Sequence, residues 1–474
     1  MSPPTLSTAR SPFDNAKADT ILQTSDNVQF HVRSAILSEA SLVFCGMFSL
    51  PEPTNPPETP VITVTEDSRT MDALLRLCYP VCDPVFTDLS LLEYVWEAAR
   101  KYGFDYAAEK AGRAVKTFLG TSPLRVFAIS CRLGVEDVAG LAAIAWKNSD
   151  TFKSLSSLQT PRKFEGTLAG GSYVTEMKNI SSEAYYRLLS FLRTNPNPQN
   201  PRFCGTSVSL TVRQNSQRVH PTFDVPSRAD ADCVIRASDG AEFFVHKLMI
   251  RSASAEALLA GEGSLDLRVD DLPIVEVEIQ SDILVELLKL CYPTNTLSVD
   301  DCAKIRRMLQ AASSYKMARI VDIIRKRVMD LLDMHPLPLF FIAIEQSWED
   351  VAEAAAKRIA TGAIKDLYTP EMKDVSAAAH FCLLKYCHQY SVIVSDAVSR
   401  YSTDAKLWKQ LEFALDSALL ISDSIVHVPL PIVESSLSSR NGSSIHEVVA
   451  KSEAMASRMK RDMSQVNVQD TASD

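Results

Sequence analysis

Short runs of alternating hydrophobic and polar residues occur near the start of the chain and again near its middle. Residues 20–32 and residues 233–245 each hold two strand-like runs separated by a polar turn. One turn contains an Asp-Asn pair and the other an Asp-Gly pair, and both pairs suit the positive φ values of tight hairpin turns. The pattern therefore predicts a β-hairpin in each of the two segments.

Helical spacing of apolar residues follows each hairpin and is interrupted by one further strand-like run. The helix after that run ends in both places at a Cys-Tyr-Pro sequence, which includes Pro80 or Pro293. A proline disfavours helical backbone angles for the residue before it, so each helix is expected to stop at the tyrosine. The other predicted elements are helices at 34–42 and 247–259, strands at 61–64 and 274–277, and later helices at 89–104, 107–119, 299–317 and 320–332.

The order of elements recurs because the sequence itself repeats at a fixed step. The run at 74–80 returns at 287–293, and Tyr102 returns as Tyr315, a step of 213 residues (315 − 102). The same step holds without a gap from the first hairpin into the helices beyond the repeated domain. A period this long indicates two duplicated domains, since solenoid repeats are about 20–50 residues long.

Further helical segments follow each copy, and polar segments separate and end the two halves. Residues 184–189 resemble residues 379–384 at a shorter step of 195 (379 − 184), so the first half carries extra residues, placed around 166–171. The predicted organisation is a flexible N-terminus at 1–13, a first domain at 14–120 with a helical extension at 121–195, a linker at 196–226, a second domain at 227–333 with an extension at 334–428, and a mostly disordered tail at 429–474.

Composition and charge fit a globular protein that does not bind nucleic acid. Hydrophobic residues make up 46% and charged residues 23% of the chain, with a formal net charge of −9. A negative protein has no general attraction to phosphate backbones. The ten cysteines lie singly in mostly apolar surroundings, which indicates free thiols in a reducing compartment. No signal peptide and no stretch long enough to span a membrane is visible, so we expect an intracellular protein in the cytoplasm, the nucleus or both.

The repeated motifs resemble the BTB/POZ domain family. The second copy carries Asp232, the Phe-Phe-Val-His-Lys sequence at 243–247 and the Cys-Tyr-Pro sequence, whereas the first copy has Arg33 at the histidine position. The first copy keeps a segment at 43–51 that is similar to fungal BTB proteins, and the second copy has weakened it at 256–261. The resemblance implies an α+β fold of a short sheet with packed helices, present twice in tandem.

The resemblance also implies a role in protein–protein association, often as a substrate adaptor for cullin-type ubiquitin ligases. We therefore expect a non-catalytic interaction module with protein partners, including a cullin, and with no nucleic acid or membrane partner. One alternative is a scaffold that associates only with itself or with other BTB proteins, and another is an enzyme whose site the sequence does not reveal. The N-terminal segment lacks the apolar run that many BTB dimers exchange, so we expect the two copies of one chain to pair with each other.

The expected cullin contact lies just after the helix that carries Phe48. BTB adaptors resembling this chain use a hydrophobic-x-Glu tripeptide there, and the first copy has Leu50-Pro51-Glu52 at that place. Phe48, Leu50 and Glu52 are the candidate partner-binding residues. The second copy has Ala260-Gly261-Glu262, which lacks a large apolar anchor. The alternative is that Leu50-Pro51-Glu52 merely ends a helix before a proline-rich loop.

No motif in the chain predicts catalysis, a cofactor or a metal. A cluster of potential metal ligands occurs at His380, Cys382, Cys387 and His388. On a helix these side chains point in different directions, so four ligands cannot meet at one ion and core packing is the better interpretation. His246 has no accompanying nucleophile and is expected to anchor its hairpin to a helix through a hydrogen bond. The glycine-rich, P-loop and metalloprotease motifs are missing from the sequence.

Overall fold

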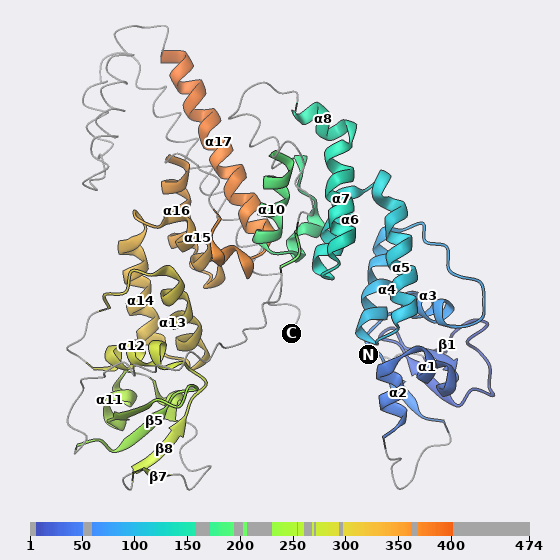
Figure 1. The fold of residues 1–474 in the computed structure, drawn as a ribbon, viewed down its shortest axis with the longest axis horizontal. Helices are drawn as coiled ribbons and strands as arrows, with labels where there is room; N and C mark the ends of the chain where they lie inside the picture. Colours follow the sequence, from blue (N-terminus) through green and yellow to red (C-terminus); the bar gives the residue numbers. More distant parts are fainter. Residues whose placement is uncertain are drawn as a thin grey trace. The chain divides into compact units, whose positions relative to one another are not determined.

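The structure is a computed structural model and describes residues 6–50, 59–156, 171–193, 202–205, 230–253, 255–259, 268–269, 272–292, 297–361 and 368–401. The chain divides into two compact units, which are considered separately below. The first consists of Met1–Ser157, Ser172–Ile180 and Arg187–Gly205, and the second of Leu158–Gly171, Ser181–Tyr186 and Thr206–Asp474. Figure 1 shows the elements of each unit.

A four-stranded sheet in the order β1-β3-β2-β4 forms the base of the first unit. Its strands are β1 (Ser7–Thr8), β2 (Thr20–Gln23), β3 (Val28–Val32) and β4 (Val61–Thr63). The predicted hairpin is confirmed, because β2 and β3 pair antiparallel with Leu22 opposite Phe30. Both side chains are buried, so alternate residues of the hairpin point into the core as the alternating sequence requires.

The N-terminal segment differs from the prediction of a flexible stretch at 1–13. Strand β1 pairs parallel with β3, and the Ala9 amide donates to the Gln29 carbonyl at 2.8 Å. Phe13 is fully buried, with its ring 5.8 Å from that of Phe30 and 5.3 Å from that of Tyr79. The prediction is therefore wrong for residues 6–13, while residues 1–5 lie outside the described part. A two-residue strand and one buried ring leave too little periodicity to recognise in a sequence.

Helices cover the sheet of the first unit and continue into an all-helical extension (Figure 1). The helices of the domain are α1 (Ser34–Ala40), α2 (Leu42–Phe48), α3 (Ser68–Cys78), α4 (Leu89–Lys101), α5 (Asp105–Lys116) and the 3-10 turn η1 (Thr117–Gly120). The extension contains α6 (Pro123–Arg132), α7 (Glu136–Asn148), α8 (Asp150–Ser156), the 3-10 turn η2 (Thr175–Asn179) and α10 (Ser182–Arg193).

Ser41 divides the helix that was predicted at 34–42. Its backbone is extended, with φ −143° and ψ 123°, so α1 ends before it and α2 begins after it. The Ser41 hydroxyl accepts a hydrogen bond from the Phe44 amide at 3.0 Å and donates to the Tyr102 carbonyl at 2.5 Å. The serine therefore caps α2 and ties its start to the end of α4.

The second unit repeats the hairpin and the helices of the first. Its sheet has the order β6-β5-β8-β7, and Ile235 lies opposite Phe243, the pair that corresponds to Leu22 and Phe30. The strands are β5 (Cys233–Arg236), β6 (Glu242–Val245), β7 (Arg268–Val269) and β8 (Leu272–Glu276). The strand prediction is thus confirmed in both copies, since β4 and β8 each pair parallel to the first strand of their hairpin.

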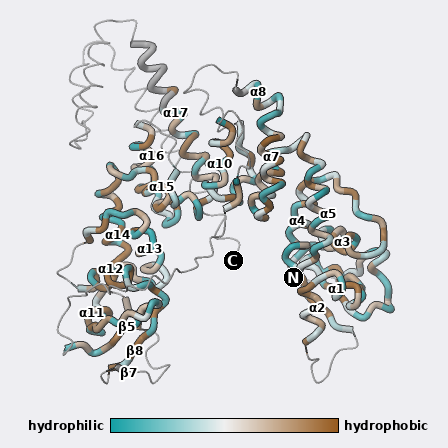
Figure 2. The backbone as a smooth tube through the Cα atoms, in the orientation of Figure 1, coloured by the Kyte–Doolittle hydropathy of each residue, from teal (hydrophilic) through white to brown (hydrophobic). Residues whose placement is uncertain are grey.

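Helices of the second unit follow the same order with one local change. The helix predicted at 247–259 is divided into α11 (Lys247–Ser252) and the 3-10 turn η3 (Glu256–Leu259). The remaining elements are α12 (Ser281–Cys291), α13 (Cys302–Ser314), α14 (Ala318–Leu331), α15 (Pro336–Glu345), α16 (Glu349–Thr361), the 3-10 turn η4 (Pro370–Lys373) and α17 (Ala377–Tyr401). Along the helices of both units the tube of Figure 2 changes repeatedly between hydrophobic and hydrophilic colours, as expected where one helix face enters a core.

Part of the predicted linker at 196–226 is packed against the first extension. The amides of Phe203 and Cys204 both donate to the Glu136 carboxylate, the second at 2.9 Å. The buried Phe203 ring lies 5.2 Å from the ring of Phe127 and 5.6 Å from that of Phe191. Phe203 and Cys204 are therefore buried in the core of the extension, which a single aromatic residue in a polar stretch did not indicate.

Candidate interaction surfaces of the first domain

An apolar surface is exposed on α2 of the first domain. Phe44 points into the core, and Phe48 is half-buried with its ring stacked 6.0 Å from that of Phe44. The remaining large side chains of this segment face outward. The α2 surface is defined here as Leu42, Val43, Met47 and Leu50, which are 77%, 42%, 37% and 67% exposed.

The corresponding segment of the second domain has no such surface among its described residues. Positions 255–259 correspond to 42–46, and there Ala255, Leu258 and Leu259 are buried while Glu256 is exposed. The 3-10 turn η3 and the polar substitution at Glu256 together remove the apolar face. The two domains therefore differ in what this segment offers to a partner.

The sequence-predicted contact residues occupy different environments. Leu50 is on the surface, as expected of an anchor for a partner. Phe48, the last residue of α2, is half-buried and packs against the edge of the core. Glu52 lies outside the described residues, as do Ala260 to Glu262 in the second domain. The sequence analysis missed the contribution of Leu42, although the weakening of this segment in the second copy pointed to the region.

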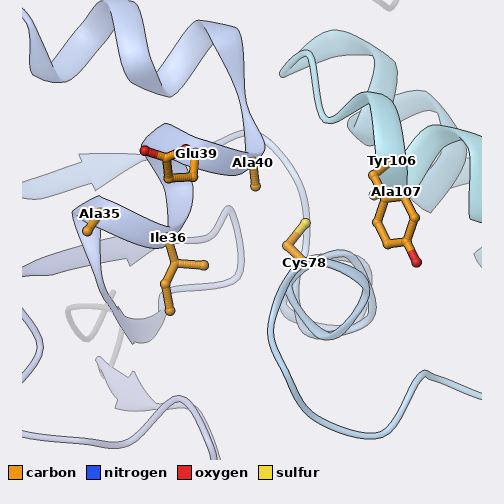
Figure 3. A pocket seen from close by; sticks show the side chains of 7 residues that line it. All are labelled: Ala35, Ile36, Glu39, Ala40, Cys78, Tyr106 and Ala107. Carbon is orange, nitrogen blue, oxygen red and sulfur yellow. The ribbon is translucent and has the colours of Figure 1, made fainter.

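A groove of about 450 Å³ opens on another side of the first domain. Figure 3 shows Cys78 between residues of α1 and residues of α5, and the lining is mostly apolar, with Glu39 as its one charged side chain. The lining residues are Ala35, Ile36, Glu39, Ala40, Cys78, Tyr106 and Ala107. Tyr106 is 60% exposed, and Lys110 lies over its ring at 4.9 Å.

The equivalent place in the second domain is bridged by an arginine. Arg319 and Ser252 correspond to Tyr106 and Glu39, and the Arg319 guanidinium donates to the Ser252 carbonyl at 3.2 Å. This hydrogen bond joins the start of α14 to the end of α11. The first domain thus offers both an exposed helix surface and an apolar groove, and the second domain differs at both places.

Tyrosines at the helix ends hold the hairpins in both domains. The Tyr79 hydroxyl accepts a hydrogen bond from the Arg33 amide at 2.8 Å, and the Tyr292 hydroxyl accepts one from the His246 amide at 3.2 Å. The His246 ring also approaches this hydroxyl, with Nδ1 at 3.2 Å. The predicted anchoring role of His246 is confirmed, and the backbone contact explains how Arg33 takes the same position.

The thiols beside these tyrosines have low nucleophilic reactivity. Cys78 Sγ donates to the Leu74 carbonyl at 3.3 Å, and Cys291 Sγ donates to the Leu287 carbonyl at 3.4 Å. Burial raises the pKa of each thiol to about 12. A thiol with such a pKa holds almost no thiolate at neutral pH, so neither cysteine is poised as a nucleophile.

The cluster of potential metal ligands lies on α17, a helix as expected. The ring of the buried His380 packs 5.7 Å from that of Tyr185 and 5.9 Å from that of Phe341. Across the described ranges, no group of three or more His, Cys, Asp or Glu residues is placed to hold a metal ion. Within the same ranges, no helix combines the length and the hydrophobicity that crossing a membrane requires.

Comparison with known proteins connects this architecture to one domain family. The model of the BTB/POZ domain matches residues 11–119 and 226–330. A search of curated proteins found no match. Each matched segment contains the hairpin, the parallel strand and the helices described above, and BTB/POZ domains are protein–protein interaction modules. The chain therefore carries two BTB/POZ domains of the α+β class in tandem, each followed by a helical extension.

Proposed function

We propose that this protein is a non-catalytic substrate adaptor for a cullin-type ubiquitin ligase and that its first domain binds the cullin through the α2 surface. The observation that carries the proposal is the exposure of four large apolar side chains, three on the short helix α2 and Leu50 just after it. Leu50, the sequence-predicted anchor, lies at the end of this surface and is 67% exposed. Contiguous apolar surface of this kind marks interaction sites on folded proteins.

The α2 surface suits a partner that inserts between its side chains. Gly46 lies among the exposed residues, and a Cβ atom at this position would meet nothing within 4 Å. Partner atoms can therefore approach the backbone of α2 closely. Covering the four side chains would contribute about 25 cal/mol for each Å² of apolar surface removed from water. Interface energy usually concentrates in a few such anchors, and Leu50 is the one we expect to dominate.

Binding of a purified cullin N-terminal region tests the proposal with three proteins. We expect the wild type to bind, Leu50→Asp to bind at least about tenfold more weakly, and Ala260→Asp to bind as the wild type does. Leu50 is exposed, so its substitution leaves the core intact, and circular dichroism checks this. Equal binding by all three proteins, or no binding by the wild type, contradicts the proposal.

A self-associating scaffold is the second candidate, and the groove between α1 and α5 of the first domain favours it. If the protein is such a scaffold, we predict that the two BTB/POZ domains of one chain pair with each other. Sedimentation separates the cases, since an obligate dimer held by BTB contacts between chains contradicts pairing within a chain. An enzyme is disfavoured at the groove, because Glu39 alone among its lining residues carries a charge.

We also propose that the protein acts inside the cell, in the cytoplasm, the nucleus or both. The expected partners are then other proteins, with a cullin at the α2 surface. The sequence at 43–51 resembles fungal BTB proteins, and we propose that this protein is of the fungal type. Affinity purification of the intact protein from its native cell, followed by mass spectrometry, tests whether a cullin is among these partners.

A further inference from the structure

The first residues of α10 belong to the second unit, although they precede the second domain in the sequence. Residues 181–186 cluster with the second unit, and Tyr186 packs against its hydrophobic core. The neighbours of this segment are residues on either side of the turn η4, namely Tyr368 and Ser376, and the first turn of α17. The second extension is thus completed by about one and a half helical turns from the first half of the chain.

The residues in this contact occupy equivalent positions of the two halves. Ser181 forms an antiparallel bridge with Ser376, and the two are separated by 195 residues (376 − 181). Tyr185 and His380 are also 195 residues apart, and their rings pack edge-on at 5.7 Å with an interplanar angle of 84°. The same step relates the repeated sequences at 184–189 and 379–384. Contact between equivalent positions is the property of an isologous interface, here inside one chain.

Hydrogen bonds and burial show that the contact is a packed one. The Ser182 amide donates to the Val375 carbonyl at 2.6 Å, and its hydroxyl donates to the Ser376 carbonyl at 2.7 Å. The Tyr368 hydroxyl donates to Glu183 Oε1 at 2.8 Å. Ser182, Glu183 and Tyr185 are all buried. Buried polar groups with matched partners are costly to separate, because each would lose its hydrogen bond.

We propose that the repeated extension segments are docking surfaces for each other and that residues 181–186 hold residues 1–205 to residues 206–474 without help from the connecting peptide. The partner of the first segment is the second segment of the same chain. Thr206 to Ala229 connect the two halves, and a connection of this length keeps a tethered partner at about millimolar effective concentration.

Cutting the connection in the intact protein tests this docking. A cleavage site for a specific protease is placed between Ser216 and Gln217 of the full chain, and the folded protein is then cut and passed over a sizing column with light scattering. We expect both fragments to elute together with the mass of one chain. Separate elution of the fragments, or particles with the mass of two chains formed by exchange of the segments, overturns the proposal.

Substitutions in the cut protein show which residues hold the fragments. Tyr185→Asp places a charge against His380 and should raise the dissociation constant of the fragments at least tenfold. The matched control is Asn179→Asp, which adds the same charge at an exposed position. The fragments of this control should dissociate with the same constant as those of the unsubstituted cut protein. Dissociation that is unchanged by Tyr185→Asp, or equally raised by the control, contradicts the role of residues 181–186.

A milder variant guards against loss of folding in Tyr185→Asp. Tyr368 is 48% exposed, and Tyr368→Phe removes only the hydroxyl that reaches Glu183. We expect this variant to keep its circular dichroism spectrum and to speed fragment separation severalfold. The double exchange Tyr185→His with His380→Tyr restores a pair of equivalent positions, and its fragments should stay together. Separation after the exchange as complete as after Tyr185→Asp contradicts the two-fold relation.

Discussion

Glu93 and Arg132 in the first domain occupy the positions that Arg306 and Glu345 occupy in the second. Each pair forms a salt bridge, at 2.9 Å in the first domain and 2.6 Å in the second, so the same bridge exists twice with its charges exchanged. It joins the long helix α4 or α13 to the first helix of the extension. These two positions therefore accommodate an ion pair in either order of charges.

A second difference between the two domains lies at the surface and concerns partners. The contact between each hairpin and the helix that follows it is the same in both domains. Asp19 and Asp232 each accept a hydrogen bond at 2.7 Å from the first backbone amide of that helix. By contrast, Leu42 is exposed where the equivalent Ala255 is buried. The copies therefore share the contacts that shape the fold and differ where a partner would bind. Only the first domain offers the apolar helix surface within the described residues.

The largest expected effect comes from the shared core. Leu75 and Leu288 are equivalent and fully buried, so Leu75→Ala and Leu288→Ala should each lower the free energy of unfolding of their own unit by about 2–5 kcal/mol. Leu248→Ala, at a position 74% exposed, is the control and should change it by less than about 0.5 kcal/mol. Denaturant unfolding measures all three, and a loss below about 1 kcal/mol for either core variant contradicts the equivalence.

The exchanged salt bridge predicts a smaller loss that can be reversed. Glu93→Arg places two arginines together and should lower the free energy of unfolding by about 2–3 kcal/mol, a value reduced for partial exposure. Glu97 also contacts Arg132 at 2.8 Å, and its equivalent Gln310 donates to Glu345 at 3.0 Å.

Copying the second domain into the first therefore requires three changes. Glu93→Arg, Glu97→Gln and Arg132→Glu together reproduce the second arrangement apart from the contact of Arg306 with Asp374 at 2.7 Å, and the triple variant should return to within about 1 kcal/mol of the wild type. A triple variant as unstable as Glu93→Arg alone would show that the charges are not interchangeable. Thermal unfolding of the three proteins under one buffer condition makes the comparison.

The hairpin aspartates predict that both domains lose stability in acid. Burial by itself raises the pKa of Asp26, but hydrogen bonds from Ser68 and Thr24 outweigh it and lower the pKa below the ordinary value of 3.8. Burial likewise raises and hydrogen bonds from Ser281 and Ala241 lower the pKa of Asp239, with a net decrease. A carboxylate whose pKa is lowered by folding stabilises the fold above its unfolded value, and this stability is lost as pH falls through the folded pKa.

Unfolding midpoints measured from pH 5 downward check this dependence. We expect the wild type to lose stability in both units below about pH 3.8. Asp26→Asn should weaken the pH dependence of the unfolding midpoint in the first unit alone. Asp239→Asn should weaken it in the second unit alone. A variant whose curve follows the wild type in its own unit contradicts the assigned hydrogen bonds.

The smallest effect on stability is expected at the α2 surface. Leu42→Ser changes a side chain that is 77% exposed, so the free energy of unfolding should stay within about 0.5 kcal/mol of the wild type. Leu37→Ser, on the neighbouring α1 and fully buried, provides the contrast and should be strongly destabilising. A large loss for Leu42→Ser would show that the residue supports the fold rather than a partner.

Much of the fold could be predicted because local signals and the repeat agreed. The hairpins carry alternation and turn residues, and α3 and α12 end at Cys78 and Cys291, as the proline of the following Cys-Tyr-Pro sequence requires. The division at Ser41 was not predicted, because its cause is a capping hydrogen bond and a contact with Tyr102 far along the chain. The repeat showed that Tyr185 and His380 are equivalent, but sequence periodicity holds no information about whether equivalent residues touch.

The candidate site could be predicted only in part. A tripeptide motif pointed to Leu50, and exposure of that residue agrees with an anchor. The motif said nothing about Leu42 and Met47, since it does not tell which face of a short helix enters the core. Phe48 shows the difficulty, because helical spacing places it beside Phe44 at the edge of the core.

The most direct test of the account is hydrogen exchange of the intact protein with and without a cullin N-terminal region. We predict slower exchange at Leu42–Phe48 and Leu50 in the complex, and unchanged exchange at Glu256–Leu259 of the second domain. Slower exchange at both segments, at the second alone, or at neither in the presence of saturating cullin would contradict the claim that the first domain alone carries the contact.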